Sequence, residues 1–232
     1  MYSFSFLDWA ALGLWGLVCL GYGFFAERVG DRRPNLMASM ARFRRTWMRE
    51  AYLRDARIAD VGLIGNLMQS ATFFSSTTLL VIGASFALMG TIERSVEVVE
   101  LMRKLPFGVR VTQELIEAKL LVLTLVLVYA FFRFSWSLRQ FNLVNIVIGA
   151  FPSRAPGDAP GDAPDERLIR MASRLNELAG LNFTQGLRAY YYAVPLLLWI
   201  IDAWLLVAGT LIITLVLCYM EFRSATVSAL AE

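Results

Sequence analysis

Long apolar stretches alternate with charged segments along this chain, and the apolar stretches set the expected architecture. Residues 6–26, 118–138 and 195–220 are each apolar over about twenty positions, the length that a helix needs to cross the hydrocarbon core of a bilayer. Residues 62–90 form a fourth stretch, which polar side chains interrupt. The pattern predicts an all-α polytopic membrane bundle with four transmembrane helices.

The last apolar stretch is longer than one crossing requires. It extends from Ala189 to Phe222 and holds Asp202 in its interior. One perpendicular crossing takes about 20 residues, and two crossings joined by a turn take more than this stretch offers. We expect one span over 195–220 after an interfacial piece. The alternative is a chain that breaks near Asp202, so that only the second half crosses.

The charged residues between the spans give the bundle a direction. Arginines are dense after the first span, whereas Asp8 is the charged residue on its N-terminal side. Loops rich in Lys and Arg stay in the cytoplasm. We expect cytoplasmic loops at 27–61 and 139–194, an outer loop at 91–117, and both termini facing outward from the inner (cytoplasmic) membrane. Residues 152–165, rich in Pro, Gly and Asp, predict a flexible segment.

Both cytoplasmic loops carry helical periodicity. Apolar residues recur at spacings of three and four over 36–51 and again over 166–178, with basic residues on the other faces. These patterns predict amphipathic cytoplasmic helices. The first either lies on the membrane, where each basic residue near anionic headgroups gains about 1 kcal/mol, or packs on this protein's own cytoplasmic segments. On the membrane, its headgroup contacts would be Arg42, Arg45, Trp47 and Arg49.

Composition narrows the classes of function. Hydrophobic residues make up 57% of the chain and charged residues 18%, with a mean hydropathy of +0.55, values outside the soluble range. The formal net charge of +3 does not indicate nucleic-acid binding, because the basic residues cluster between the apolar stretches. The chain has no histidine and no nucleotide, hydrolase or dithiol motif. We therefore expect no metal site, no cofactor and no enzymatic activity.

Two sets of polar residues within the apolar stretches are candidates for function. Arg133 and Asp202 are expected to pair, either as a coupling or ion-path site or as a structural ion pair. The second span also carries Gly83, Ala87 and Thr91 as a small-residue ladder that another helix can approach closely. The polar face of this span either lines a solute path or packs on another helix, and its members are Asn66, Gln69, Ser70 and Thr77.

Three segments resemble a known family. They read ADVGLIGNLMQSATFFSSTTLL (59–80), FRFSWSLRQFN (132–142) and GLNFTQGLRAYYYAVPLLLW (180–199), and they are similar to the domain of unknown function 599 family. That family comprises predicted membrane proteins of bacteria and plants with no established activity. The resemblance covers most of the chain and implies a helical membrane fold, but it transfers no catalytic residue. It directs attention to the polar residues Arg139, Asn142, Asn182, Arg188 and Tyr191.

These patterns favour a non-enzymatic membrane protein, either an assembly or accessory subunit or a lipid-interacting bundle. Its expected partners are anionic membrane lipids and either further copies of itself or the other subunits of a membrane complex. The alternative is a small-solute or ion transporter or channel whose path uses the polar face of the second span and Asp202.

Overall fold

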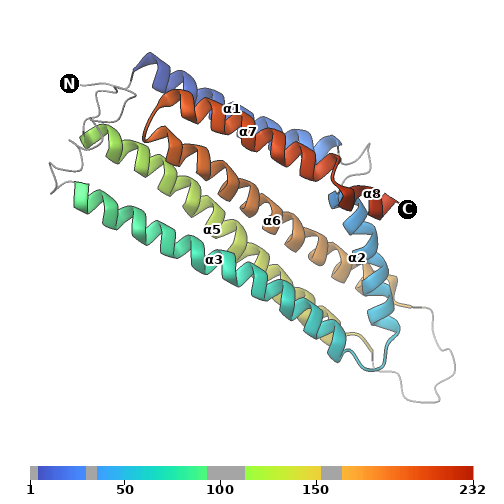
Figure 1. The fold of residues 1–232 in the computed structure, drawn as a ribbon. Helices are drawn as coiled ribbons and strands as arrows, with labels where there is room; N and C mark the ends of the chain where they lie inside the picture. Colours follow the sequence, from blue (N-terminus) through green and yellow to red (C-terminus); the bar gives the residue numbers. More distant parts are fainter. Residues whose placement is uncertain (1–4, 30–35, 93–112, 153–163, 232) are drawn as a thin grey trace.

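The computed structural model describes residues 5–29, 36–92, 113–152 and 164–231, and every regular element in these ranges is a helix (Figure 1). Four of the helices are long and apolar enough to cross a membrane, over Phe6–Ala26, Ile58–Thr91, Gln113–Gly149 and Ala203–Val227. The expected all-α bundle with four spans is thereby confirmed. The helices are α1 (Phe6–Val29), α2 (Leu36–Leu53), α3 (Ile58–Ile92), α5 (Gln113–Gly149), α6 (Glu166–Trp199), α7 (Ala203–Phe222) and α8 (Ala225–Ala231).

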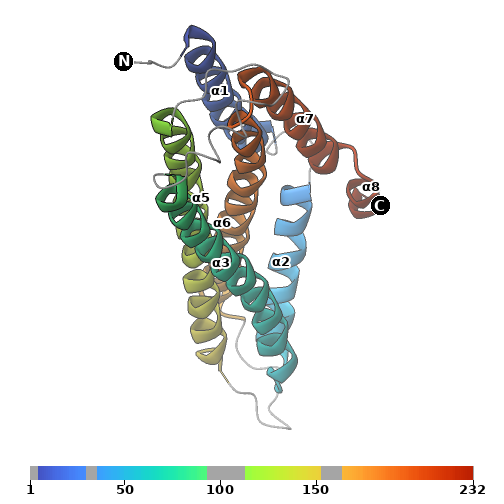
Figure 2. The ribbon, with the colours of Figure 1, turned by 60° about the vertical axis from the view of Figure 1, so that its left-hand side comes forward.

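The bundle has two tiers along its length (Figures 1 and 2). Helices α3, α5 and α6 contain 35, 37 and 34 residues, so each is roughly 50 Å long and exceeds the hydrocarbon core of about 30 Å. Helices α1 and α7, with 24 and 20 residues, accompany only one half of α6, and α2 packs beside the other half. We call the half with α1 and α7 the upper tier and the half with α2 the lower tier.

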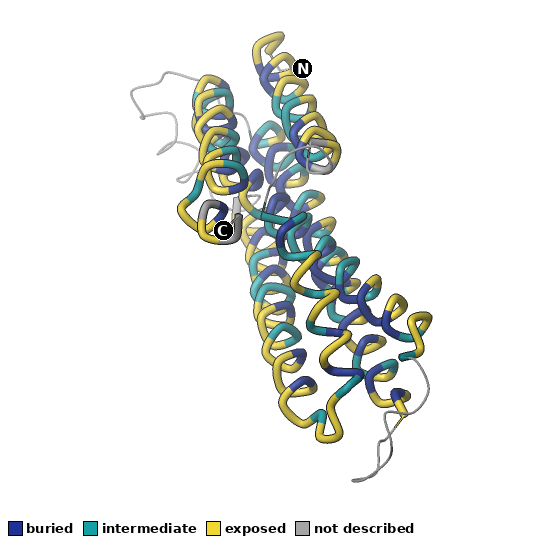
Figure 3. The backbone as a smooth tube through the Cα atoms, turned by 90° about the vertical axis from the view of Figure 1, so that its right-hand side faces the viewer, coloured by how far each residue is buried: buried dark blue, intermediate teal, exposed yellow. Residues whose placement is uncertain are grey.

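Each tier has its own apolar core. Trp199, Leu120 and Leu206 are buried together in the upper tier, and Met48 and Ile169 lie in the corresponding core of the lower tier. In Figure 3 the buried positions face the inside of the bundle, and the exposed positions face outward. Because α3, α5 and α6 run through both tiers, the two cores belong to one continuous bundle.

The outer surface of the apolar helices is suited to lipid. In the most apolar 18-residue segment of each of these four helices, only 17% to 39% of the residues are buried. Large apolar side chains point outward, among them Leu17 (72% exposed), Leu80 (74%) and Leu215 (69%). Soluble proteins rarely expose contiguous apolar surface on this scale. The chain is therefore a membrane protein.

The apolar stretch 189–222 is divided at Asp202. Helix α6 ends at Trp199, and α7 begins at Ala203 after Asp202 in an extended conformation. The Asp202 carboxylate accepts a hydrogen bond of 2.7 Å from the backbone N–H of Trp204 and thereby caps α7. The expected continuous span over 195–220 is wrong, and the break near Asp202 is correct. Helix α6 itself runs the length of the bundle and packs on α5, α7 and α2.

The break at Asp202 also determines where the C-terminal helices lie. Helices α1 and α7 run in the same direction, since Asp8 contacts Trp199 at the upper end and Tyr22 contacts Glu221 near the lower tier. The described chain therefore begins at the outer end of the upper tier and ends beside the junction of the two tiers (Figure 2). That both termini face outward stays a prediction.

The remaining loop predictions have mixed outcomes. Helix α5 continues to Gly149, so the first part of the expected cytoplasmic loop 139–194 extends the third span as a helix. Most of the expected outer loop 91–117 and most of the expected flexible segment 152–165 lie outside the described residues.

Candidate functional site

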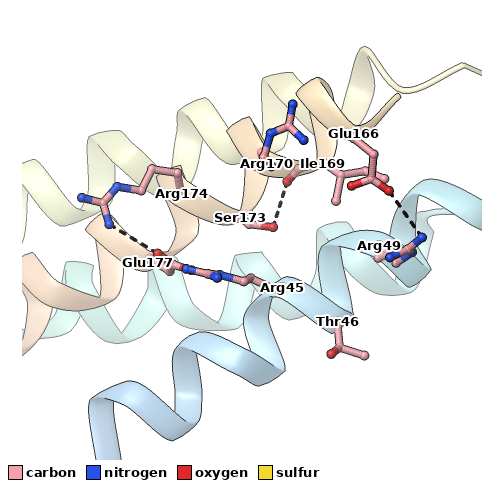
Figure 4. A pocket seen from close by; sticks show the side chains of 9 residues that line it. All are labelled: Arg45, Thr46, Arg49, Glu166, Ile169, Arg170, Ser173, Arg174 and Glu177. Atoms are coloured by element: carbon pink, nitrogen blue, oxygen red, sulfur yellow. Dashed lines mark hydrogen bonds and ion pairs between the residues drawn. The ribbon is translucent and has the colours of Figure 1, made fainter. Parts of the chain in front are cut away.

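A basic cleft of about 470 Å³ separates α2 from α6 in the lower tier (Figure 4). Helix α2 contributes Arg45 and Arg49, and α6 contributes Arg170 and Arg174. Each pair is four residues apart, a spacing that places both side chains on one face of a helix. The sequence thus brings four guanidinium groups to one cleft. Its other lining residues are Thr46, Glu166, Ile169, Ser173 and Glu177.

Two glutamates form ion pairs with three of these arginines. Glu177 contacts Arg45 at 2.9 Å and Arg174 at 3.4 Å, and Glu166 contacts Arg49 at 3.3 Å. The three arginine side chains are more than half exposed, but the Glu177 side chain is only 11% exposed. The Arg49–Glu166 pair is exposed on both sides, and such pairs contribute only about 0–1 kcal/mol. Among the described residues Arg170 makes no ion pair, so the cleft keeps an excess of positive charge.

Another arginine, Arg44, lies against α6 beside the cleft. A Cβ atom on Gly180 would collide with the Arg44 guanidinium, so the glycine allows this close approach. Burial lowers the pKa of Arg44, and the nearby Glu177 carboxylate opposes that shift. Arginine remains protonated in proteins, so Arg44 adds to the positive potential.

Helix α2 packs on the protein itself. Met48 and Ala51 are buried in the lower core, and Trp47 donates a hydrogen bond of 2.7 Å to Asp60. Of the expected headgroup residues, Arg45 and Arg49 face α6 and Arg42 is exposed. The packing alternative describes this helix, and lipid contact by Arg42 stays a prediction.

The polar face of α3 points away from the bundle. Asn66, Gln69 and Ser70 are exposed, and the neighbouring Ile64 is buried in the lower core. Thr77 is half-buried in the upper tier. The first part of the predicted second span therefore belongs to the lower tier, and a solute path along these residues would require a second chain to complete it.

Arg133 and Asp202 do not pair. Arg133 donates hydrogen bonds of 2.8 Å to Asn182 and to the Tyr129 hydroxyl, whereas Asp202 caps α7 at the top of the upper tier. The predicted pair is wrong because Asp202 lies at the upper end of the bundle, whereas Arg133 lies near the middle of α5 beside Asn182.

A buried ion pair that sequence reasoning missed closes the top of the upper tier. Lys119 Nζ lies 3.2 Å from Asp8 Oδ1 and donates a hydrogen bond of 2.8 Å to the Trp199 carbonyl. The Trp199 indole donates to the same Asp8 oxygen at 2.9 Å. Lys119 is only 2% exposed. We call these three residues the upper lock, because they join α1, α5 and α6.

A second buried ion pair lies where the upper tier meets the lower tier. Arg188 Nη2 donates to Glu221 Oε1 at 2.5 Å, and the Tyr22 hydroxyl donates to Glu221 Oε2 at 2.7 Å. The Arg188 guanidinium also lies 5.5 Å from the centre of the Tyr22 ring. We call these residues the lower pair, and they join α1, α6 and α7.

The other polar residues of the family-like segments have separate roles. Asn182 is buried and donates to Gln140 at 2.8 Å. Arg139 and Asn142 are exposed on α5, and Tyr191 is partly exposed on α6. Within the described ranges, no group of three His, Cys, Asp or Glu side chains is placed to hold a metal ion.

Comparison with known proteins identifies a family. No curated protein and no solved structure matches this chain. A family model matches residues 10–226 and carries the description "Protein of unknown function, DUF599". The match spans nearly the whole bundle, from α1 to α8. The chain belongs to this DUF599 family of proteins of unknown function.

Proposed function

We propose that this membrane protein is a non-enzymatic assembly or accessory subunit whose lower tier docks an acidic segment of a partner protein. The α2–α6 cleft carries this proposal. Its arginines come from two helices, and the three that form ion pairs keep side chains more than half exposed. A partner's carboxylates can therefore pair with Arg170 and displace Glu166 from Arg49 at a cost of only about 1 kcal/mol.

The position of the cleft favours a soluble segment over a lipid headgroup. Glu177 precedes Arg188 on α6 by about 16 Å of helix, and Arg188 already lies where α1 and α7 end. The cleft is therefore beyond the tier that lipid would surround. Arginine density in the lower tier supports an inner-membrane location with this tier in the cytoplasm.

The outer face of α3 supports assembly as well. This helix packs chiefly against α5, and its ladder of Gly83, Ala87 and Thr91 is exposed. A Cβ at Gly83 would meet no atom within 4 Å. Helices associate closely in membranes through such small-residue faces. We propose that a second copy of the chain packs here.

Binding of a labelled hexaglutamate peptide tests the docking proposal. The protein is reconstituted in nanodiscs of zwitterionic lipid, so that lipid charge does not contribute, and affinity is measured by fluorescence anisotropy. We expect Arg170→Glu to weaken binding at least tenfold and to leave unfolding unchanged. We also expect affinity to fall between 0.05 and 0.5 M salt, since salt screens exposed charges.

Arg167→Glu is the matched control. Arg167 is exposed on the same helix and does not line the cleft, so the change in net charge is the same. An equal loss in both variants would attribute binding to overall charge and overturn the proposal. Unaltered binding by Arg170→Glu would overturn it too.

A further inference from the structure

A groove of about 540 Å³ runs between α1, α5 and α6 in the upper tier. Its walls are mostly apolar and include Trp15, Leu20, Val122 and Leu125. Its volume lies within the usual range of about 300–1,000 Å³ for sites that bind small molecules. This groove is separate from the α2–α6 cleft and shares no lining residue with it.

Two glycines keep the α1 side of the groove open. Gly16 and Gly23 both line it, and a Cβ atom on either would meet no atom within 4 Å. They are seven residues apart, which is close to two helical turns and places them on one face of α1. The stretch between them is about 10 Å long, so the open face suits a narrow apolar chain.

Polar groups gather at one end of this groove. Tyr129, Gln185 and Arg188 line the end toward the lower tier, whereas Trp15, Val122 and Tyr192 line the end toward the upper lock. Arg133 donates to the Tyr129 hydroxyl, and the Arg28 guanidinium lies 4.4 Å from the centre of the Phe24 ring at the same end. A molecule that fits must therefore be apolar along its length and anionic at one end.

Arg188 carries the donor that an anionic ligand in this groove would need. It is only 8% exposed, and Glu221 occupies its Nη2 atom. Its Nη1 atom is buried and has no hydrogen-bond partner in the part of the chain that the structure describes. A buried donor without a partner costs about 1–3 kcal/mol, and more when it is charged. An oxygen of an anionic ligand in the groove would satisfy it.

We propose that this groove binds an anionic phospholipid, with one acyl chain between α1 and α5 and a phosphate oxygen accepting a hydrogen bond from Arg188. The charge supports this occupant, because Arg28, Arg133 and Arg188 outnumber Glu221 among the described charged side chains at this end. The location supports it too, because the polar end lies where α1 and α7 end, at the expected level of the headgroups.

Native mass spectrometry of the detergent-purified protein tests this site. The protein is titrated with dioleoylphosphatidylglycerol, dioleoylphosphatidylcholine and oleic acid. We expect one phosphatidylglycerol to bind at least tenfold more tightly than phosphatidylcholine. The double variant Gly16→Leu/Gly23→Leu fills the groove and should lose this bound lipid. Arg188→Gln should reduce the preference for phosphatidylglycerol to less than threefold.

Gly21→Leu is the control for the filled groove. Gly21 is exposed on α1, does not line the groove, and has no atom within 4 Å of a built Cβ. We expect it to bind phosphatidylglycerol as the unmodified protein does. Retained binding by Gly16→Leu/Gly23→Leu overturns the proposal, even if Arg188→Gln fails to fold. Tight binding of oleic acid without phosphatidylglycerol also overturns it, because the ligand would then be a free carboxylate.

Discussion

The upper lock and the lower pair are both buried ion pairs, yet they differ in how completely their donors are used. In the upper lock, Lys119 reaches both Asp8 and the Trp199 carbonyl, and the Trp199 indole adds a third bond. In the lower pair, Arg188 leaves Nη1 without a partner among the described residues and faces two cavities, of about 540 and 260 Å³.

This difference separates a structural role from a binding role. A buried pair whose members are fully hydrogen-bonded fixes the helices that carry it, and removing one partner leaves an uncompensated charge. A pair that leaves one charged donor without a partner beside a cavity can donate a hydrogen bond to a ligand in that cavity. The upper lock thus joins the helices at one end of the upper tier, whereas the lower pair offers a hydrogen-bond donor to a ligand at the other end.

The largest effect is expected from breaking the upper lock. Lys119→Met should lower the free energy of unfolding by about 3–5 kcal/mol, because Asp8 stays buried without its cation. Denaturant titration in detergent, followed by circular dichroism, measures the loss. Asp8→Asn combined with Lys119→Met should recover most of it. A double variant as unstable as the single one would show that the pair does not act as a unit.

Breaking the lower pair should cost less. We expect Arg188→Met to lower the free energy of unfolding by about 2 kcal/mol, typical of losing a hydrogen bond to a charged group. Glu221 keeps its bond from Tyr22, and it lines the cavity of about 260 Å³, through which water can reach its carboxylate. The same titration measures it. A loss as large as that of Lys119→Met would erase the distinction between the two pairs.

An exposed ion pair should give the smallest effect. Arg49→Ala removes the 3.3 Å contact with Glu166, and both side chains are about half exposed. We expect the free energy of unfolding to change by less than about 1 kcal/mol. Thermal unfolding at low and high salt provides the measurement. A larger, salt-independent loss would mean that the cleft is a structural element and argue against a docking role.

The sequence predicts the bundle well because apolar length and charge density are local properties. The arginines of 27–61 and the apolar length of residues 6–26 need no tertiary information to interpret. The break at Asp202 is visible only as an alternative, because length alone does not separate one tilted span from a hairpin. In the structure, α6 ends at Trp199 and the Asp202 side chain caps the start of α7.

The buried ion pairs cannot be predicted from the sequence, for a different reason. Asp8 and Lys119 are remote in sequence and meet only when α1 and α5 both pack on α6. Arg188 lies in a family-like segment, but Glu221 stands near the end of an apolar stretch and gives no periodic signal. The exposure of Asn66 and Gln69 is likewise set by which side of α3 meets α5.

The course of α6 has a consequence for how the protein enters its membrane. This helix is not among the four that are apolar enough to cross alone, and it carries Asn182 and Arg188 in buried positions. Charged and amide side chains oppose partitioning of a lone helix into lipid. During synthesis, α6 should therefore leave the insertion machinery as a hairpin with α7, onto a surface that α5 has already built. The order of translation would then set the order of packing, because α5 is in place before α6 and α7 are made.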